Sequence, residues 1–334
     1  MRIKHFTLLM MATILIGCTC QDKTQCSKID LILDSDANNE LDDQHAIAYM
    51  LLNQDTYNPL GITINGTKYG GDATEQAKEA ERVAKMVGKY GENVKIIAGA
   101  SNCFDSIVPN IANDNFDGVD AVNFIIESAK KYNADNKLNI VAVGKLTNIA
   151  LALAKNPTIK DNIRLLWLGS NYPAPGEYNL INDIPSLVYV LDQDIEMGIA
   201  LVHPDVSNKY GTTKVNMQRW QVQEYIAGKG PKVQPVEGRY DGRTFTCFGD
   251  YSLDLFDQCS HDNTYTRSIH DMVAVAILAH PEWSKRDTIP APTMVDGQFV
   301  DRPSNTHKIT LWYNFNLFAI IQSLIDILDE TTDK

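Results

Sequence analysis

The chain has 334 residues, of which 44% are hydrophobic and 22% are charged, and its formal net charge is −12. This is the composition of a globular protein that is long enough for one large α/β domain or two small ones. An acidic balance repels phosphate backbones, so the composition argues against a nucleic-acid partner bound through a broad basic face.

The first residues have the layout of an export signal. Arg2 and Lys4 precede an apolar run at residues 6–16 that is too short to span a bilayer comfortably. The run leads into the sequence LIGC, which resembles the lipobox of bacterial lipoproteins with Cys18 as the lipidated residue. We therefore expect residues 1–17 to be a lipoprotein signal peptide and the protein to be exported and anchored to a bacterial membrane by lipid. An ordinary signal peptide followed by a chance cysteine is the alternative.

After a polar tether at residues 18–28, short apolar runs alternate with stretches of helical periodicity. In chain order we expect a strand at 29–33, a helix at 42–52, a strand at 60–64, a helix at 73–87, a strand at 94–98, a helix at 119–131, a strand at 138–143, a helix at 147–154, a strand at 163–168, a helix beginning near Pro185, a strand at 198–202, a helix at 271–278, a strand at 309–313 and a helix at 315–328. This alternation predicts a mostly parallel central sheet with helices on both faces.

The alternation stops between about residues 203 and 260, where the chain is polar and rich in aromatic residues. We interpret this stretch as an insertion or cap beside the sheet. Residues 29–330 are thus expected to form a single α/β domain.

The loop after the first strand carries five carboxylates in ten residues, at 34–43, and no basic residue. Open α/β sheets bind their ligands at this edge. Two carboxylates 4 Å apart repel by roughly 4 kcal/mol at an effective dielectric constant near 20, and a hard cation relieves that repulsion. Asp42 and Asp43 are also favourable at a helix start, but this account leaves Asp34 and Asp36 unexplained.

Two other kinds of site share parts of this pattern. The spacing resembles the start of an EF-hand, but Asn39 replaces the required glycine and His45 replaces the bidentate glutamate, so we reject it. A strand that ends in Asp-x-Asp also resembles the haloacid-dehalogenase-like phosphatases, with Asp34 as the nucleophile. Asn38 then stands where those enzymes usually have Thr or Val.

The sequence LDSD followed by LDDQHA resembles the N-terminal signature of the inosine-uridine preferring nucleoside hydrolases, strand–DxDPGxDDAxA. Residues 37–40 replace the Pro-Gly-x link of the signature and are longer than it. Three further blocks follow in the family's order, namely VGKLTNIA at 143–150, NYPAPGEYN at 171–179 and HD at 270–271. The resemblance covers about residues 29–280, apart from the stretch at 203–260.

The resemblance implies a Rossmann-like α/β fold and calcium-dependent hydrolysis of the N-glycosidic bond of ribonucleosides, giving ribose and free base. It implies that Ca²⁺ is bound by Asp36, Asp43, the Val143 carbonyl and Asp271. Asp36 would also be the general base, and His270 the acid that protonates the leaving base.

The substrate-binding residues follow from the same resemblance. Asp42 and Asn179 would bind the ribose hydroxyls, and Asn171 with Glu177 the 5′ end of the sugar. A further sugar-binding position falls on Asp72, with Asn65 as its competitor, and Asp34 would support the metal ligands. Family members commonly form homodimers or homotetramers, which makes self-association the expectation here.

Rival functions stay open at this point. The altered link at 37–40 and the stretch at 203–260 allow a glycosidase that acts on another ribosyl or N-linked compound. A sugar-binding relative that has lost turnover is a second rival, and the phosphatase is a third.

Overall fold

The computed structural model describes residues 27–67, 70–259 and 265–332. The expected signal peptide, Cys18 and most of the tether lie outside these residues. No helix within the described ranges is both long and apolar enough to cross a bilayer.

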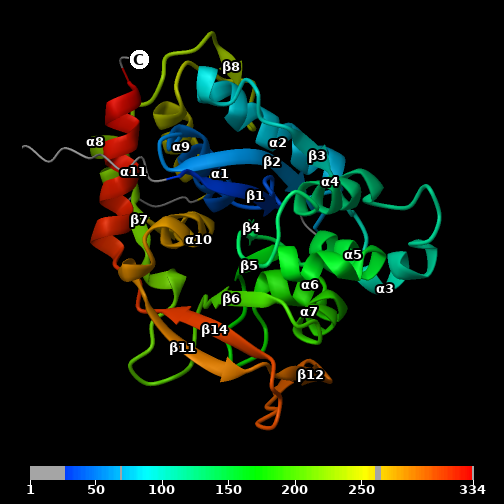
Figure 1. Ribbon diagram of the computed structural model, residues 1–334. Coiled ribbons are helices and arrows are strands. Elements are labelled where there is room, and N and C mark those ends of the chain that lie inside the picture. The colour runs from blue at the N-terminus through cyan, green and yellow to red at the C-terminus, as the bar shows by residue number, and fades with distance from the viewer. Residues whose placement is uncertain (1–26, 68–69, 260–264, 333–334) are drawn as a thin grey trace, which may run out of the picture.

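One eight-stranded sheet forms the centre of the molecule (Figure 1). Its strands are β1 (Ile29–Ser35), β2 (Tyr57–Ile64), β3 (Ile96–Ala98), β4 (Leu138–Ala142), β5 (Ile163–Leu168), β6 (Glu196–Ala200), β11 (Lys285–Pro290) and β14 (Lys308–Tyr313). The order across the sheet is β11-β14-β6-β5-β4-β1-β2-β3. Every neighbouring pair is parallel except β11 with β14. The predicted mostly parallel sheet is confirmed.

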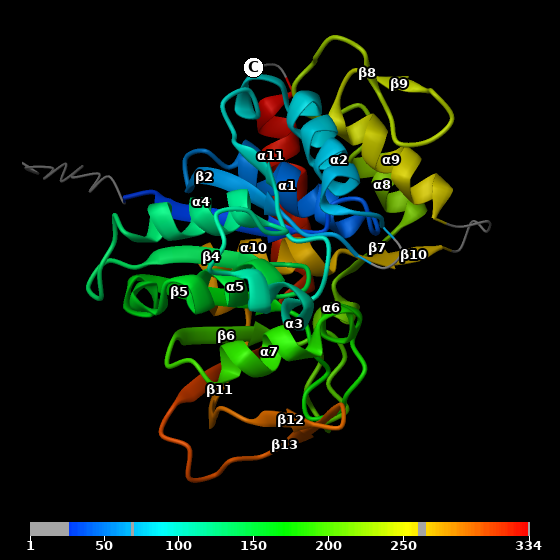
Figure 2. The same ribbon diagram turned by 90° about the vertical axis from the view of Figure 1, so that its right-hand side faces the viewer.

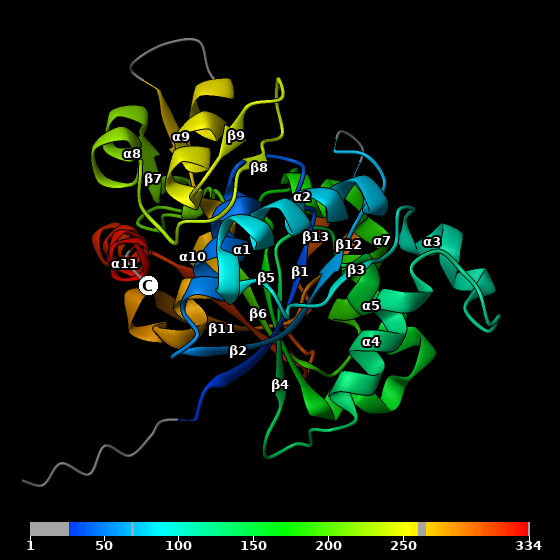
Figure 3. The ribbon, with the colours of Figure 1, turned by 90° about the horizontal axis from the view of Figure 1, so that it is seen from above.

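Helices cover both faces of this sheet (Figure 3). One face carries α1 (Asp42–Leu52), α2 (Ala73–Met86), α10 (His270–Ala279) and α11 (Leu317–Thr331). The other carries α4 (Val119–Ala129), α5 (Thr147–Lys155) and α7 (Ile184–Leu191). Each face has its own hydrophobic core, because the buried side chains divide into two clusters on opposite sides of the strands. The predicted helices on both faces are confirmed.

The segment at residues 203–260, in its described part at 203–259, adds no strand to the central sheet. It contains β7 (Asn216–Gln218), α8 (Arg219–Tyr225), β8 (Val236–Glu237), β9 (Thr244–Phe245) and α9 (Phe248–Gln258), and β7 pairs with β10 (Thr266–Ser268). Figure 2 shows β8, β9 and α9 beside α2. Phe248 and Phe256 of α9 place their rings edge-on to His45 of α1, at centroid distances of 5.4 and 6.0 Å. The segment therefore covers the outer side of α1 and extends the core on that face.

Several short elements were not expected from the sequence. They are α3 (Phe104–Ile107), α6 (Tyr178–Asn182), the antiparallel edge strand β11 and the hairpin of β12 (Thr293–Val295) with β13 (Gln298–Val300).

Candidate metal and sugar site

A cavity of about 560 Å³ lies at the carboxyl edge of the parallel strands. Its wall includes Asp36 after β1, Val143 after β4, Leu168 at the end of β5 and Val202 after β6. Parallel α/β sheets bind ligands at this edge, because the loops that follow the strands converge there.

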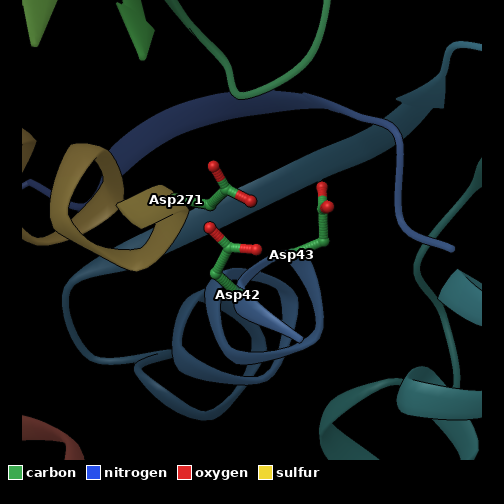
Figure 4. A group of neighbouring side chains, drawn as sticks. All are labelled: Asp42, Asp43 and Asp271. Atoms are coloured by element: carbon green, nitrogen blue, oxygen red, sulfur yellow. The ribbon is translucent and has the colours of Figure 1, made fainter. Parts of the chain in front are cut away.

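Two helices begin at this cavity and bring three carboxylates together. Asp42 and Asp43 lie in the first turn of α1, and Asp271 lies in the first turn of α10. The helices pack against each other, so one oxygen from each carboxylate lies within 4.8 Å of the others (Figure 4). All three side chains are buried. The positive end of each helix dipole favours a carboxylate in the first turn, but two helix starts do not by themselves require three buried acids at one point.

Asp36 contributes a fourth buried carboxylate to the cavity wall. Its Oδ2 is buried and makes no hydrogen bond to any residue in the described part of the chain. Its backbone carbonyl accepts a hydrogen bond from the Asn39 amide at 2.9 Å, which closes a turn just after β1. A Cβ at Gly144 would lie 3.1 Å from Asp36 Oδ1, so a glycine at this position leaves room for the carboxylate.

Burial and mutual repulsion change the acidity of this group. Burial, followed by the charges of neighbouring carboxylates, raises the pKa of Asp36, Asp42 and Asp271 well above the usual value. Burial also raises the pKa of Asp43 to about 7. Hydrogen bonds to its carboxylate, such as the 2.6 Å bond that the Ser35 hydroxyl donates, lower this pKa but do not outweigh the effect of burial. Without a cation, these side chains are therefore poorly suited to carry their full negative charge.

The donor set fits a hard divalent cation. Carboxylate and carbonyl oxygens are the ligands of calcium, and an unpartnered buried oxygen such as Asp36 Oδ2 is satisfied when a cation binds it. Asp36, Asp43, Asp271 and the Val143 carbonyl would hold the ion, as expected from the sequence, and Asp42 lies within the same cluster. The Val143 carbonyl accepts one hydrogen bond, from Asn179 Nδ2 at 2.8 Å, and keeps a second lone pair.

The residues expected to bind the sugar form another part of the wall, where Asn171, Glu177 and Asn179 all line the cavity. Glu177 is fixed because its carboxylate accepts backbone amides of Ser170, Asn179 and Leu180, each at 3.0 Å. Asn179 uses its amide nitrogen on the carbonyls of Val143 and Leu168, so its amide oxygen is the atom it offers to a ligand. Asn171 Oδ1 accepts the backbone amide of His203 at 2.9 Å.

His270 lines the same cavity and bonds to Thr212 Oγ1 through Nδ1 at 2.8 Å. Burial, followed by the positive charge of Arg267, lowers the pKa of His270 to about 4. The imidazole is therefore neutral at pH 7 in the free protein. The role of His270 as the acid stays a prediction, and it requires that the bound substrate raise this pKa.

Asp34 does not face the cavity. It is fully buried, and its carboxylate accepts bonds from Thr63 Oγ1 at 2.6 Å, from Asn148 Nδ2 at 2.9 Å and from Asn65 Nδ2. The backbone carbonyl of Asp34 also accepts the Val143 amide at 2.8 Å, which joins the ends of β1 and β4. This environment suits a supporting role, and it is unsuited to the phosphatase nucleophile, which must reach a substrate.

Asp72 lies apart from the other residues expected to bind the sugar. This residue is exposed and is the N-cap of α2, where its carboxylate accepts the amides of Thr74 and Glu75 at 2.9 Å. It is not part of the cavity wall. Its competitor Asn65 is buried against Asp34 and the Lys145 carbonyl and is likewise outside the wall.

Four polar residues of the lining were not predicted, namely Asn39, Glu40, Tyr178 and His203. Asn39 and Glu40 belong to the acidic loop. The family signature does not indicate where they lie, because the link at 37–40 departs from it. His203 follows a strand of the sheet closely, and this position was the only signal for it.

Comparisons with known proteins agree with this architecture. The profile of one protein family, described as inosine-uridine preferring nucleoside hydrolase, matches residues 31–312. A probable ribonucleoside hydrolase of Dictyostelium discoideum is 28% identical over 171 residues, which are 48% of this chain and 46% of that protein. A non-specific ribonucleoside hydrolase of Salmonella schwarzengrund is 29% identical over 156 residues, 45% of this chain and 44% of that protein. The matched region thus spans less than half the length of each of these two relatives.

Solved structures share the fold at lower identity. A purine-preferring ribonucleoside hydrolase from Gardnerella vaginalis superposes with a TM-score of 0.64 at 19% identity, covering 90% of this chain and 98% of that one. A plant nucleoside hydrolase superposes with a TM-score of 0.67 at 15% identity, covering 90% and 99%.

Proposed function

The chain belongs to the inosine-uridine preferring nucleoside hydrolase family, and from that premise we propose that it hydrolyses the N-glycosidic bond of ribonucleosides with the help of Ca²⁺. The observation that carries the proposal is the meeting of Asp42, Asp43 and Asp271 at the start of two helices, beside the unpartnered oxygen of Asp36. Such a cluster of hard oxygen donors is suited to a divalent cation, and the neighbouring amide and carboxylate groups are suited to sugar hydroxyls.

Cleavage of a ribosyl C–N bond passes through an oxocarbenium-like transition state, with water attacking the face of the sugar opposite the leaving base. Bound Ca²⁺ would supply the positive charge that polarises the attacking water and holds the ribose 2′- and 3′-hydroxyls. The new bond joins the water oxygen to C1′, and the electron pair of the broken C–N bond leaves with the base.

In this reaction Asp36 accepts the proton of the attacking water. Asp36 lines the cavity, and burial keeps its carboxylate away from competing bulk water. Asp42 and the amide oxygen of Asn179 accept hydrogen bonds from the ribose hydroxyls. Asn171 and Glu177 are assigned to the 5′ end of the sugar.

His270 is assigned to the departing base. When the Thr212 hydroxyl donates to Nδ1, the imidazole proton lies on Nε2, where it can hydrogen-bond the base. Negative charge that develops on the base favours the imidazolium form and raises the pKa of His270 in the complex. His270 then transfers a proton to the base.

The test is a panel of common purine and pyrimidine ribonucleosides, assayed for free ribose with the protein produced without residues 1–17. We expect at least one nucleoside to be cleaved, chelation to stop the release and added Ca²⁺ to restore it. Absence of ribose from every nucleoside at saturating Ca²⁺ would contradict the proposal.

One observation favours a second candidate of the same chemical class. Asn39 and Glu40 belong to the altered link and line the cavity, so its wall differs from the family signature. A related ribosyl or other N-linked compound then becomes the substrate. A synthetic riboside with a good leaving group that is cleaved when all common nucleosides fail would favour this candidate.

The export signal leads to a proposal about location and assembly. We infer that Cys18 carries lipid and that the protein is tethered to a bacterial membrane, as a homodimer or homotetramer. Labelling with a fatty-acid analogue that disappears in Cys18→Ser would support the anchor, and light scattering of the soluble form would give the assembly.

A further inference from the structure

The link at residues 37–40 has little structure of its own. It joins Asp36 to the start of α1, and within it the Asn39 amide bonds back to the Asp36 carbonyl. Asn39 and Glu40 nevertheless form part of the cavity wall. The position of these two residues must therefore be set by contacts from elsewhere in the chain.

Asn38 is the point where such contacts converge. Its amide donates to Gln76 Oε1 of α2, and its side chain donates to the Gly70 carbonyl at 3.2 Å. Its own carbonyl accepts a hydrogen bond from Arg239 Nη2 at 2.5 Å. Arg239 lies between β8 and β9, in the segment that covers α1 and α2 (Figure 3).

Arg239 extends from a well-anchored hairpin. The guanidinium of Arg82 donates to the Glu237 carbonyl at 2.8 Å and pairs with the buried Glu79. Tyr251 of α9 donates to the same Glu79 carboxylate at 2.5 Å. The Arg239 guanidinium also lies over the ring of Tyr240, 5.1 Å from its centroid. Arg239 is thus pre-organised to hold the link.

A second arginine holds the other end of the link. Arg267 Nη2 lies 3.3 Å from Glu40 Oε2. Arg267 belongs to β10 and lies just before His270 and Asp271. It therefore connects the link to the strand that directly precedes α10, the helix that supplies the third carboxylate of the cluster.

We propose that Arg239 and Arg267 are positioning residues that hold the link at 37–40, so that Asn39 and Glu40 form a fixed wall of the cavity that selects the substrate. The arginines act through the link and do not touch the reacting atoms. The expected change in KM rests on the proposed ribonucleoside hydrolysis, whereas the expected change in the hydrogen exchange of the link does not.

The test compares Arg239→Met, Arg267→Met and Arg239→Lys with the control Arg219→Met. Arg219 lies in the same covering segment but pairs with Asp257, away from the link. Hydrogen exchange of the amides of residues 37–40 is measured first. We expect about tenfold faster exchange in both Met variants, less acceleration in Arg239→Lys, which can still donate to the Asn38 carbonyl, and no change in the control.

Kinetics on a cleaved ribonucleoside give the second readout. We expect KM to rise about tenfold in both Met variants, because the wall binds substrate, and kcat to change less than about threefold in Arg239→Met. The kcat of Arg267→Met does not enter the test, since the charge of Arg267 also acts on His270. Native exchange and native KM in Arg267→Met or in folded Arg239→Met would overturn the proposal. If Arg239→Met fails to fold, Arg267→Met alone decides. A native protein that cleaves no nucleoside would overturn the proposed function, and the exchange rates would still test the positioning role.

Discussion

The carboxylates of Asp42, Asp43 and Asp271 are the residues whose chemistry most needs an explanation. A buried charge is costly unless it is paired, and these three buried groups lie within 4.8 Å of one another. Burial and mutual repulsion raise the pKa of each of them. Without a cation, this arrangement lowers the free energy of unfolding, and a bound divalent cation offsets that loss.

Replacing Asp271 by Asn tests directly whether this carboxylate lowers stability without metal and binds the cation when it is present. We expect Ca²⁺ affinity and kcat/KM each to fall at least about 100-fold. The reason is that removing a direct metal ligand should cost at least as much affinity as removing a residue that only supports a ligand. The metal-free variant should also be more stable to unfolding than the metal-free native protein, since one buried like charge is gone. Calorimetric Ca²⁺ titration and denaturant unfolding give the two values. A variant that is less stable than native without metal and still binds Ca²⁺ normally would contradict the account.

Asp72 provides the matched contrast among the acids. It caps α2 through two amide hydrogen bonds and does not line the cavity. Asp72→Ala should therefore lower the free energy of unfolding by about 1 kcal/mol, as expected for the loss of an N-cap. Ca²⁺ affinity should stay native, and ribose release should stay within about twofold. A large loss of activity without a loss of stability would return Asp72 to the sugar-binding site.

At the scale of elements, the covering segment is joined to α1 and α2 by buried polar contacts. His45 donates through Nδ1 to the Leu41 carbonyl at 2.6 Å, and its Nε2 accepts the Ser252 hydroxyl at 2.8 Å. Burial lowers the pKa of His45 to about 4, so the ring is neutral and suited to these two bonds at pH 7. Tyr251 adds the bond to Glu79. α9 and the start of α1 are therefore held in a fixed relation.

Tyr251→Phe removes one of these contacts and keeps the ring. We expect the free energy of unfolding to fall by about 1–3 kcal/mol, because Glu79 is buried and loses a hydrogen-bond donor. Tyr225→Phe is the control, since Tyr225 is 41% exposed, and it should change stability by less than about 0.5 kcal/mol. Urea unfolding of both variants measures the difference. Equal stability of the two would show that the Glu79 contact contributes nothing to the docking of α9.

Most of the central elements could be predicted because their patterns are strong. The predicted runs at 29–33, 138–143 and 163–168, which lie in or overlap β1, β4 and β5, each contain a single polar residue, as expected for strands buried on both faces. α2 has apolar positions on one side. The edge strand β11 escaped prediction because its sequence KRDTIP has little apolar character, and its pairing with β14 is a tertiary effect. The four-residue α3 is too short for a periodic signal.

The site was predictable where a residue type and a helix start coincide. Asp42, Asp43 and Asp271 each lie in the first turn of a predicted helix, so the topology brings them to one edge. Asp72 also precedes a helix, but capping alone accounts for it, and composition cannot separate the two cases. The contact of Arg239 with the link joins residues far apart in a stretch without a recognisable pattern, and only the folded chain shows it.

At the scale of the whole molecule, stability should depend jointly on pH and on the cation. The pKa of Asp43 is raised to about 7 and that of Asp34 to about 6, from the usual 3.8 of an aspartate. A folded-state pKa above the unfolded value favours the folded state at low pH, and this contribution is lost as pH rises through about 6 to 7. Calcium binds the ionised carboxylates, so its stabilisation grows over the same range.

We therefore expect the shift in Tm caused by saturating Ca²⁺ to increase between pH 5 and pH 8. A concentration 100 times the Kd corresponds to about 2.7 kcal/mol of added stability. Thermal unfolding at matched ionic strength, with Mg²⁺ and with chelator in parallel, gives the shift at each pH. A shift that is independent of pH, or larger at pH 5 than at pH 8, would contradict the role of these carboxylates.

The most direct test of the central claim is the anomalous scattering of crystals of this protein soaked in Ca²⁺. The account predicts one strong peak in the cavity, within 2.3–2.6 Å of oxygens from Asp36, Asp43, Asp271 and the Val143 carbonyl. A well-ordered crystal in which this position stays empty at millimolar Ca²⁺, or in which the ion binds without Asp271, would contradict it.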